Sequence, residues 1–141
     1  DASTLIVQRT GLITISGEFT HEDFAVGGAS TTHTISSVAL LPAGAVIVAF
    51  KIKSLEAFAA PDASAAVVQL EIGTTNIHSG TTNVFNTVSA TNYTVAYASQ
   101  VTLSNDAENQ IDLELTLTGD NVNDLTAGVV GFSISYVNLQ I

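Results

Sequence analysis

A strict alternation of apolar and polar residues between Gln110 and Thr118 constrains the fold more than any other feature of this chain. Side chains alternate between the two faces of a β-strand, so the pattern predicts a strand with one buried face and one hydrated face. The apolar members are Ile111, Leu113, Leu115 and Leu117, and the polar members are Gln110, Asp112, Glu114, Thr116 and Thr118.

The same period of two recurs along the chain and predicts about eight strands. In the segment from Ala45 to Lys53 it predicts that the inward side chains are Val46, Val48, Phe50 and Ile52, and that the outward ones are Ile47, Ala49, Lys51 and Lys53. In the last strand, which runs on through Val137 and Leu139, it predicts burial of Val130, Phe132, Ile134 and Tyr136. Less regular strands are predicted at residues 11–19, 32–40, 66–72, 84–89 and 94–103. No amphipathic helix is expected, although the Ala-rich residues 54–66 could form one short helical turn.

Short antiparallel strands with one apolar face are best accommodated by two sheets packed face to face. We therefore predict an all-β fold: a single-domain antiparallel β-sandwich of about eight strands, of the jelly-roll type. An immunoglobulin-like sandwich is the alternative, weakened by the absence of tryptophan and cysteine. The sandwich is expected to span residues 12–141, and residues 1–11 are interpreted as an N-terminal arm. Within the arm, Leu5, Ile6 and Val7 are suited to add a strand to the sheet edge of a neighbouring molecule.

The charge composition excludes two classes of partner. The 141 residues include 13 acidic but only 3 basic side chains, which gives a formal net charge of -10. A chain without a basic run cannot neutralise the phosphates of nucleic acid or the head groups of an anionic membrane. No apolar run approaches the roughly 18 to 20 residues of a spanning helix. We expect a protein that binds neither nucleic acid nor a membrane.

The residues that could carry chemistry do not form a recognisable active site. His21, His33 and His78 lack the spacing of metal-ligand pairs, and the absence of cysteine excludes thiol chemistry. Asp112 and Glu114 share one strand face, as the carboxylates of some glycosidases do, but no tryptophan is available to stack on a sugar. We predict no enzymatic activity and no cofactor.

The densest group of oxygen ligands lies at residues 120–124, where Asp120, Asn123 and Asp124 are weak candidates for calcium binding. An EF-hand loop requires an oxygen ligand at its third position and glycine at its sixth, whereas this run has valine and leucine there. A polar turn is the favoured interpretation, and no metal site is predicted.

Long charged side chains are scarce on the predicted surface. Lysine and glutamate are depleted at protein interfaces, so their scarcity indicates a surface that contacts other proteins. Apolar residues in the outward phase either belong to such an interface or lie beneath a loop. Together with three residues of the arm, they make up the predicted interface: Leu5, Ile6, Val7, Ile47, Val129, Val137 and Leu139.

Residues Val38–Phe58, Val68–Gly73 and Leu125–Tyr136 carry structural motifs that resemble those of a known family, the small β-sandwich head proteins of tailed bacteriophages. Residues Val38–Phe58 are similar to a segment of that family in which a polar strand, a Pro-x-Gly turn and an apolar strand ending in lysine are followed by Ala-Phe. Val68–Gly73 resembles the strand that follows it, and Leu125–Tyr136 resembles the last strand. The resemblance spans Val38–Tyr136, leaves the N-terminal third unmatched, and rests on structural motifs without catalytic residues.

This resemblance implies a capsid decoration or cement protein, a non-enzymatic structural protein on the outer surface of the virion. It would bind and stabilise the shell of the major capsid protein, and it would act as a homotrimer. The alternative is a glycan- or receptor-binding β-sandwich module, such as the tip of a head fibre or adhesin, with Tyr93 as its exposed aromatic residue.

Overall fold

The computed structural model describes residues 11–77, 82–86, 90–94, 103–104 and 106–138, and this part of the chain is almost entirely β-structure. No described helix is long and apolar enough to cross a membrane. The elements in chain order are β1 (Ile13–Thr20), α2 (His21–Ala25), β2 (Thr32–Leu41), β3 (Ala45–Ala59), β4 (Ala65–Ile72), β5 (Thr75–Asn76), β6 (Thr82–Asn83), β7 (Ala90–Thr94), β8 (Asn109–Thr118), the 3-10 helix η2 (Val122–Asp124) and β9 (Ala127–Asn138).

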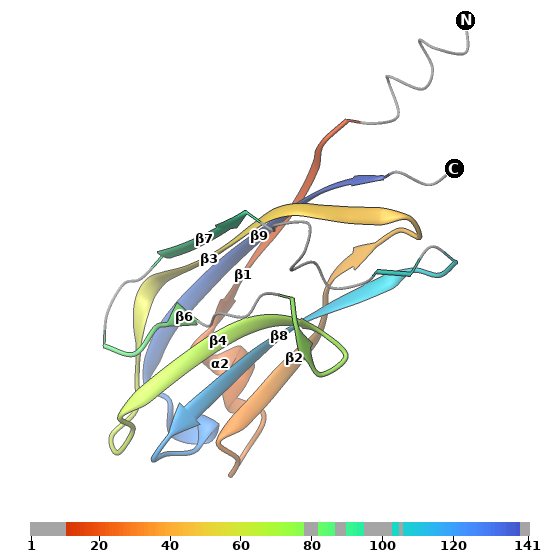
Figure 1. Ribbon diagram of the computed structural model, residues 1–141. Coiled ribbons are helices and arrows are strands. Elements are labelled where there is room, and N and C mark those ends of the chain that lie inside the picture. Colours follow the sequence, from red (N-terminus) through yellow and green to blue (C-terminus); the bar gives the residue numbers. More distant parts are fainter. Residues whose placement is uncertain (1–10, 78–81, 87–89, 95–102, 105, 139–141) are drawn as a thin grey trace, which may run out of the picture.

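The strands form two antiparallel sheets that pack face to face (Figure 1). Sheet A has the order β1-β9-β3-β7, and sheet B has the order β2-β8-β4-β5, with β6 also paired to β4. Four antiparallel pairs are nested in sequence about β5, as in a single long hairpin that folds into two sheets. They are β1 with β9, β2 with β8, β3 with β7 and β4 with β6. This arrangement confirms the predicted jelly roll. The immunoglobulin-like alternative is wrong, because that fold places its first and last strands in different sheets.

Inward side chains of both sheets share one hydrophobic core. The predicted alternation of β8 is confirmed, because its four apolar side chains are at most 2 % exposed while the residues between them face outward. They belong to the same buried cluster as Ile134 and Tyr136 of β9, which were also predicted to be inward. The core lies between the sheets and leaves the outer face of each sheet for polar residues.

The predicted phase of β3 is wrong in its first half. Ile47 is buried, at 6 % exposed, whereas Val46 and Val48 are only half-buried. The register of β3 against β9 shifts between Ile47 and Ala49, which makes Val48 the extra residue of a β-bulge. Because one extra residue exchanges the two faces, the strand follows the predicted phase only from Phe50 onward.

The helical turn expected within residues 54–66 is not formed, and a five-residue helix lies elsewhere. Residues 54–59, inside the stretch predicted to form a helical turn, continue β3. The helix is α2, which follows β1 directly: the Thr20 N–H donates to the Asp23 carboxylate at 2.8 Å. Its Phe24 is fully buried and packs edge to face on Phe58, with ring centroids 5.9 Å apart. The helix thereby closes one end of the sandwich (Figure 1).

Two weaker strand predictions are displaced. Where a strand was predicted over residues 84–89, pairing occurs at β6 and at Phe85, which forms an isolated parallel bridge with Phe58. β7 ends at Thr94, where the other strand was predicted to begin, and residues 95–102 of that prediction lie outside the described residues.

Candidate functional site

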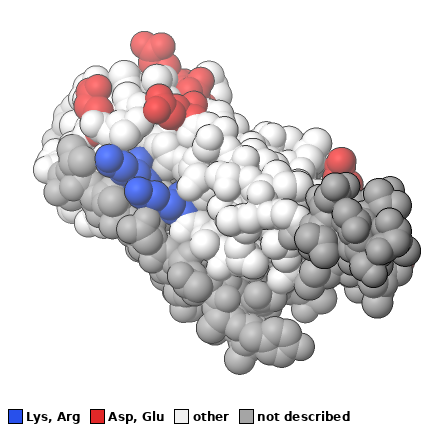
Figure 2. Space-filling model, turned by 90° about the horizontal axis from the view of Figure 1, so that it is seen from above, with Lys and Arg blue, Asp and Glu red and all other residues white. Residues whose placement is uncertain are grey.

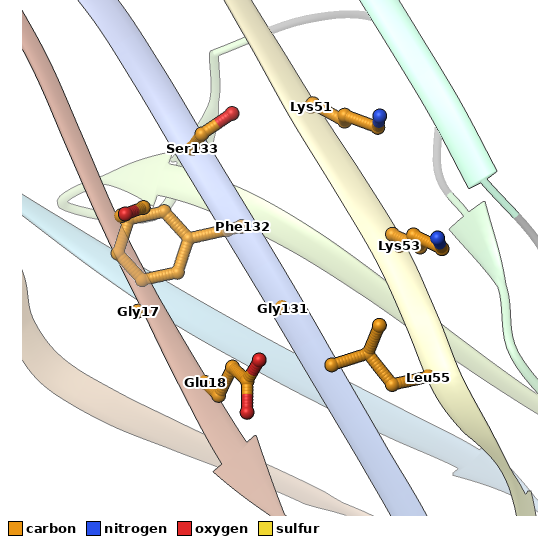
Figure 3. Close-up of a pocket in the computed structure, with 9 residues that line it drawn as sticks. Gly17, Glu18, Lys51, Lys53, Leu55, Gly131, Phe132 and Ser133 are labelled. Carbon is orange, nitrogen blue, oxygen red and sulfur yellow. The ribbon is translucent and has the colours of Figure 1, made fainter.

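The outer face of sheet A carries a shallow hollow of about 280 Å³ between β1, β9 and β3 (Figure 3). Gly131 of β9 lies at its centre, and because it has no side chain the surface drops to the backbone there. A Cβ at this position would lie 3.6 Å from the Gly17 carbonyl oxygen and 3.8 Å from Leu55, which is ordinary contact. The other lining residues are Ser16, Glu18, Lys51, Lys53, Phe132 and Ser133.

Gly17 and Gly131 lie on neighbouring strands but have different roles. Gly17 is opposite Phe132 in the β1–β9 register, and a Cβ on Gly17 would lie 3.0 Å from the Phe132 ring. The ring occupies the space that Gly17 leaves open and stacks on Phe19, with centroids 6.2 Å apart and an interplanar angle of 7°. Gly17 therefore accommodates a core aromatic side chain, whereas Gly131 opens the outer surface.

Lys51 and Lys53 border the hollow and are the cations of the described chain. Both are exposed on the same face, as predicted. They are two positions apart along β3, so their Cα atoms are about 6.5 to 7 Å from each other. In Figure 3 both lysines lean away from β9 toward β7, while Glu18 and Leu55 lean over Gly131 from opposite sides. Among described residues, neither lysine forms an ion pair. Figure 2 shows the lysine residues as one compact blue patch that does not touch the red acidic residues.

Polar side chains on the outer face of sheet B bond to one another. The hydroxyl groups of Thr34 and Thr116 donate to the two oxygens of Glu114, at 3.3 and 3.4 Å. Thr32 donates in turn to the Thr116 hydroxyl at 3.2 Å. The Glu114 carboxylate is thus held by hydroxyl groups of β2 and β8.

Asp112 stabilises a bulge in β2. The β2–β8 register shifts around Ser37, whose φ of 57° is in the left-handed region. The Ser37 N–H donates to Asp112 Oδ1 at 2.9 Å, and the Gln110 amide donates to the same oxygen at 2.9 Å. Asp112 and Glu114 share a face as predicted, but the protein itself supplies hydrogen-bond donors to both carboxylates.

Glu71 of β4 is a third carboxylate on this face that sequence reasoning did not identify. It lies opposite Asp112 in the β4–β8 register and is 3 % exposed. Burial, with Glu114 and Asp112 adding repulsion, raises the pKa of Glu71, although the Gln69 amide donates to it at 3.0 Å and opposes the rise. Spacing within one strand could not reveal Glu71, because only the pairing of β4 with β8 places it beside Asp112.

Three aspartates gather at the end of the sandwich where α2 contacts η2, and we call Asp62, Asp120 and Asp124 the acidic end. The Asp62 N–H donates to Asp120 at 2.9 Å and the Asn121 N–H donates to it at 2.8 Å. These bonds lower the pKa of Asp120, whereas its hydrogen bond with Asp124 raises the pKa of Asp124.

Of the predicted calcium ligands, the structure brings Asp120 and Asp124 together, and Asn123 is exposed on η2. No group of three or more His, Cys, Asp or Glu residues suited to a metal ion occurs within the described ranges. The polar turn stays the predicted interpretation of these residues, with calcium binding as its weaker alternative.

The predicted interface residues occupy different environments. Ile47 was expected to face outward, and this is wrong because the bulge turns it into the core. Val129 and Val137 are half-buried in the outward row of β9 that contains Gly131. The remaining predicted interface residues lie outside the described part of the chain: Leu5, Ile6, Val7 and Leu139.

The histidines and Tyr93 do not build a site in the described structure. His21 begins α2, and half-buried His33 lies against Gly27, where a Cβ would come within 2.8 Å of the His33 side chain. His78 lies outside the described residues, as does the side chain of Tyr93. Sequence reasoning missed Gly131, although a glycine inside an alternating strand is itself a signal of close approach or an open surface.

No protein-family model matches the sequence, and no curated protein matches it. Among solved structures, a chain of the cyanophage Pam1 capsid asymmetric unit aligns with a TM-score of 0.53 and 11 % identity, covering 92 % of this chain and 86 % of that one. A chain of the acid-stable capsid of Helicobacter pylori bacteriophage KHP30 gives 0.46 and 17 %, covering 92 % and 89 %. The VP2 subviral particle of infectious bursal disease virus gives 0.42 and 12 %, covering 92 % of this chain but 33 % of that one. These structural neighbours are viral capsid proteins, and the likeness to the Pam1 chain shows that this chain shares its fold.

Proposed function

We propose that this protein is a virion structural protein, a capsid decoration or cement protein of a tailed phage. It binds the outer surface of the major capsid protein shell, stabilises that shell and acts as a homotrimer without enzymatic activity. The observation that carries the proposal is the match to a chain of a phage capsid asymmetric unit, which covers 92 % of one chain and 86 % of the other. The jelly roll is thus matched as a whole.

The surface chemistry supports a binding role. A decoration protein needs several protein contacts and no reaction centre. Asp112 and Glu114, the strand-face carboxylates with the best spacing for acid–base chemistry, accept hydrogen bonds from Ser37, Thr34 and Thr116. The outer face of sheet A instead carries an open hollow edged by exposed Leu55, a shape that the side chains of another protein can fill.

Shell stabilisation follows from mass action. A subunit that binds the assembled shell but not its separated proteins favours the assembled state in proportion to occupancy, and many copies add their effects. No large conformational change is needed, because a jelly roll presents preformed faces and loops.

The test uses particles of the phage lacking this gene, mixed with increasing amounts of the purified protein. We expect saturable, symmetric occupancy by cryo-electron microscopy, with density for three copies per site, and a higher temperature of capsid disruption than in untreated particles. Absence of occupancy at saturating protein would contradict the proposal. Glycan-array binding that is lost in Tyr93→Ala would then favour the receptor-binding alternative.

A further inference from the structure

The lysine pair on sheet A consists of two exposed charges that no described residue neutralises. Lys51 and Lys53 are exposed side by side, and neither forms an ion pair with a described residue. Two rows run in register across the face: one joins Lys51, Ser133 and Ser16, and the other joins Lys53, Gly131 and Glu18. Glu18 is two strands from Lys53, about 9 to 10 Å across the sheet, and no ion pair joins the two side chains in the described structure.

Small side chains make this face accessible to a partner. Ser133 and Gly131 of β9 lie beside the lysines, Ser16 of β1 follows them, and exposed Leu55, at 43 %, adds an apolar edge. The hollow is wide and shallow, so it suits the side chains of a protein better than it encloses a small molecule. The partner that fits two neighbouring ammonium groups carries at least two neighbouring carboxylates.

Such carboxylates are present on this chain itself, at the acidic end. Asp62 and Asp124 are exposed there on either side of Asp120, whose oxygens are occupied by the N–H groups of Asp62 and Asn121. The hydrogen bond with Asp120 raises the pKa of Asp124, and the nearby negative charges of Asp120 and Asp62 add to the rise. The acidic end lies beside α2 and η2, not on the outer face of sheet A, so one molecule does not pair its own two patches.

We propose that the lysine pair of sheet A binds the acidic end of a second copy of this chain. The contact is head to tail, because two different patches meet, and it closes into a ring of three when each copy is turned by a third of a turn. The inference rests on the self-association included in the proposed function, and it is independent of capsid binding. Complementary charge fixes the register of the contact, while Leu55 and the small residues provide close packing.

Charge variants test this contact. Lys51→Ser with Lys53→Ser removes the positive patch and changes the net charge by two. Ser36→Glu with Thr74→Glu changes the net charge by the same amount at exposed positions of sheet B and its hairpin, and serves as the matched control. Asp62→Lys with Asp124→Lys reverses the acidic end but keeps Asp120 and its two backbone bonds. Circular dichroism and thermal unfolding verify that each variant folds.

Analytical ultracentrifugation measures self-association. We expect the lysine variant to raise the dissociation constant roughly tenfold or more, and the control to change it much less. A chain carrying Lys51→Glu and Lys53→Glu together with Asp62→Lys and Asp124→Lys should recover association, since the signs of both patches are exchanged. A folded lysine variant that associates like wild type, or a wild-type chain that is monomeric at every concentration, overturns the inference.

The same proteins added to gene-deleted particles separate the two proposals. Single copies of the lysine variant on the shell, where wild type binds as clustered copies, would support both proposals. Clustered copies of the folded lysine variant would overturn the head-to-tail contact alone. A wild-type protein that associates through this contact but leaves particles bare would contradict the capsid role alone.

Discussion

The outer faces of the two sheets differ in where their polar groups find partners. On sheet B, Glu114 accepts from two threonines, Asp112 accepts from the β2 bulge, and Gln69 donates to Glu71. On sheet A, the pair Thr14 and Ser135 is hydrogen-bonded at 2.8 Å, but the two lysines form no ion pair with any residue that the structure describes.

The difference indicates that the outer face of sheet B stabilises the monomer, whereas the outer face of sheet A is available for contacts. Polar groups that form hydrogen bonds with one another stabilise the monomer, and few of their donors and acceptors remain free for a partner. Charges without an internal partner contribute little to the monomer and remain available for association. The following variants, in decreasing order of expected effect, test whether sheet B stabilises the monomer while sheet A serves contacts.

The two neighbouring glycines of sheet A give the largest contrast. Gly17→Ala should destabilise the protein by about 1–3 kcal/mol, because its Cβ would press on the buried Phe132 ring. Gly131→Ala should raise stability by up to about 1 kcal/mol, because it adds an ordinary contact and stiffens a strand. Chemical denaturation of both variants measures the difference, and equal losses would show that the hollow is part of the folded core.

Asp112→Ala should cost about 1 kcal/mol, since the Ser37 N–H of the β2 bulge and the Gln110 amide lose their shared acceptor. Asp112→Asn keeps an acceptor oxygen and should cost less. Thermal unfolding compares the two. If Asp112→Ala unfolds like wild type, the bonds on sheet B are not stabilising the monomer.

Glu71→Gln should stabilise the protein at neutral pH by about 0.2–1 kcal/mol, because it removes a buried carboxylate opposite Asp112 while Gln69 keeps an acceptor. The pKa of Glu71 is raised in the folded state, so the native protein favours its protonated form and gains stability as pH falls through that raised pKa. The advantage of the variant should therefore disappear below the ordinary glutamate pKa of 4.5.

The control for this experiment is the exposed Glu108→Gln, which should change stability little at any pH. Denaturant titrations at neutral and acidic pH measure both variants. A Glu71→Gln variant that is less stable than wild type at neutral pH would mean that the carboxylate has a stabilising partner.

Periodicity predicted the parts of the fold in which each strand is regular. The buried residues of β8 and β9 were predicted correctly from alternation, because buried and more exposed residues alternate along most of each strand. The phase of Ile47 could not be predicted, because the bulge at Val48 is a property of the pairing between β3 and β9. Helix α2 was missed because five residues are too few to show a helical period.

The candidate site was only partly visible in the sequence. Outward Lys51 and Lys53 were predicted, but their position beside Gly131 required the order of strands in sheet A. Glu71 and the acidic end likewise depend on neighbours that are distant in sequence, which a strand-by-strand pattern cannot supply.

Because β9 lies between β1 and β3, the outer face of sheet A becomes continuous only after β9 has been synthesised. β1 and β3 leave the ribosome early, yet Gly131 and Ser133, which join them into one surface, are made more than 70 residues later than Lys53. A nascent chain that has not reached β9 has no continuous face to offer. If the lysine pair binds a second copy as proposed, synthesis delays that association until β9 is present.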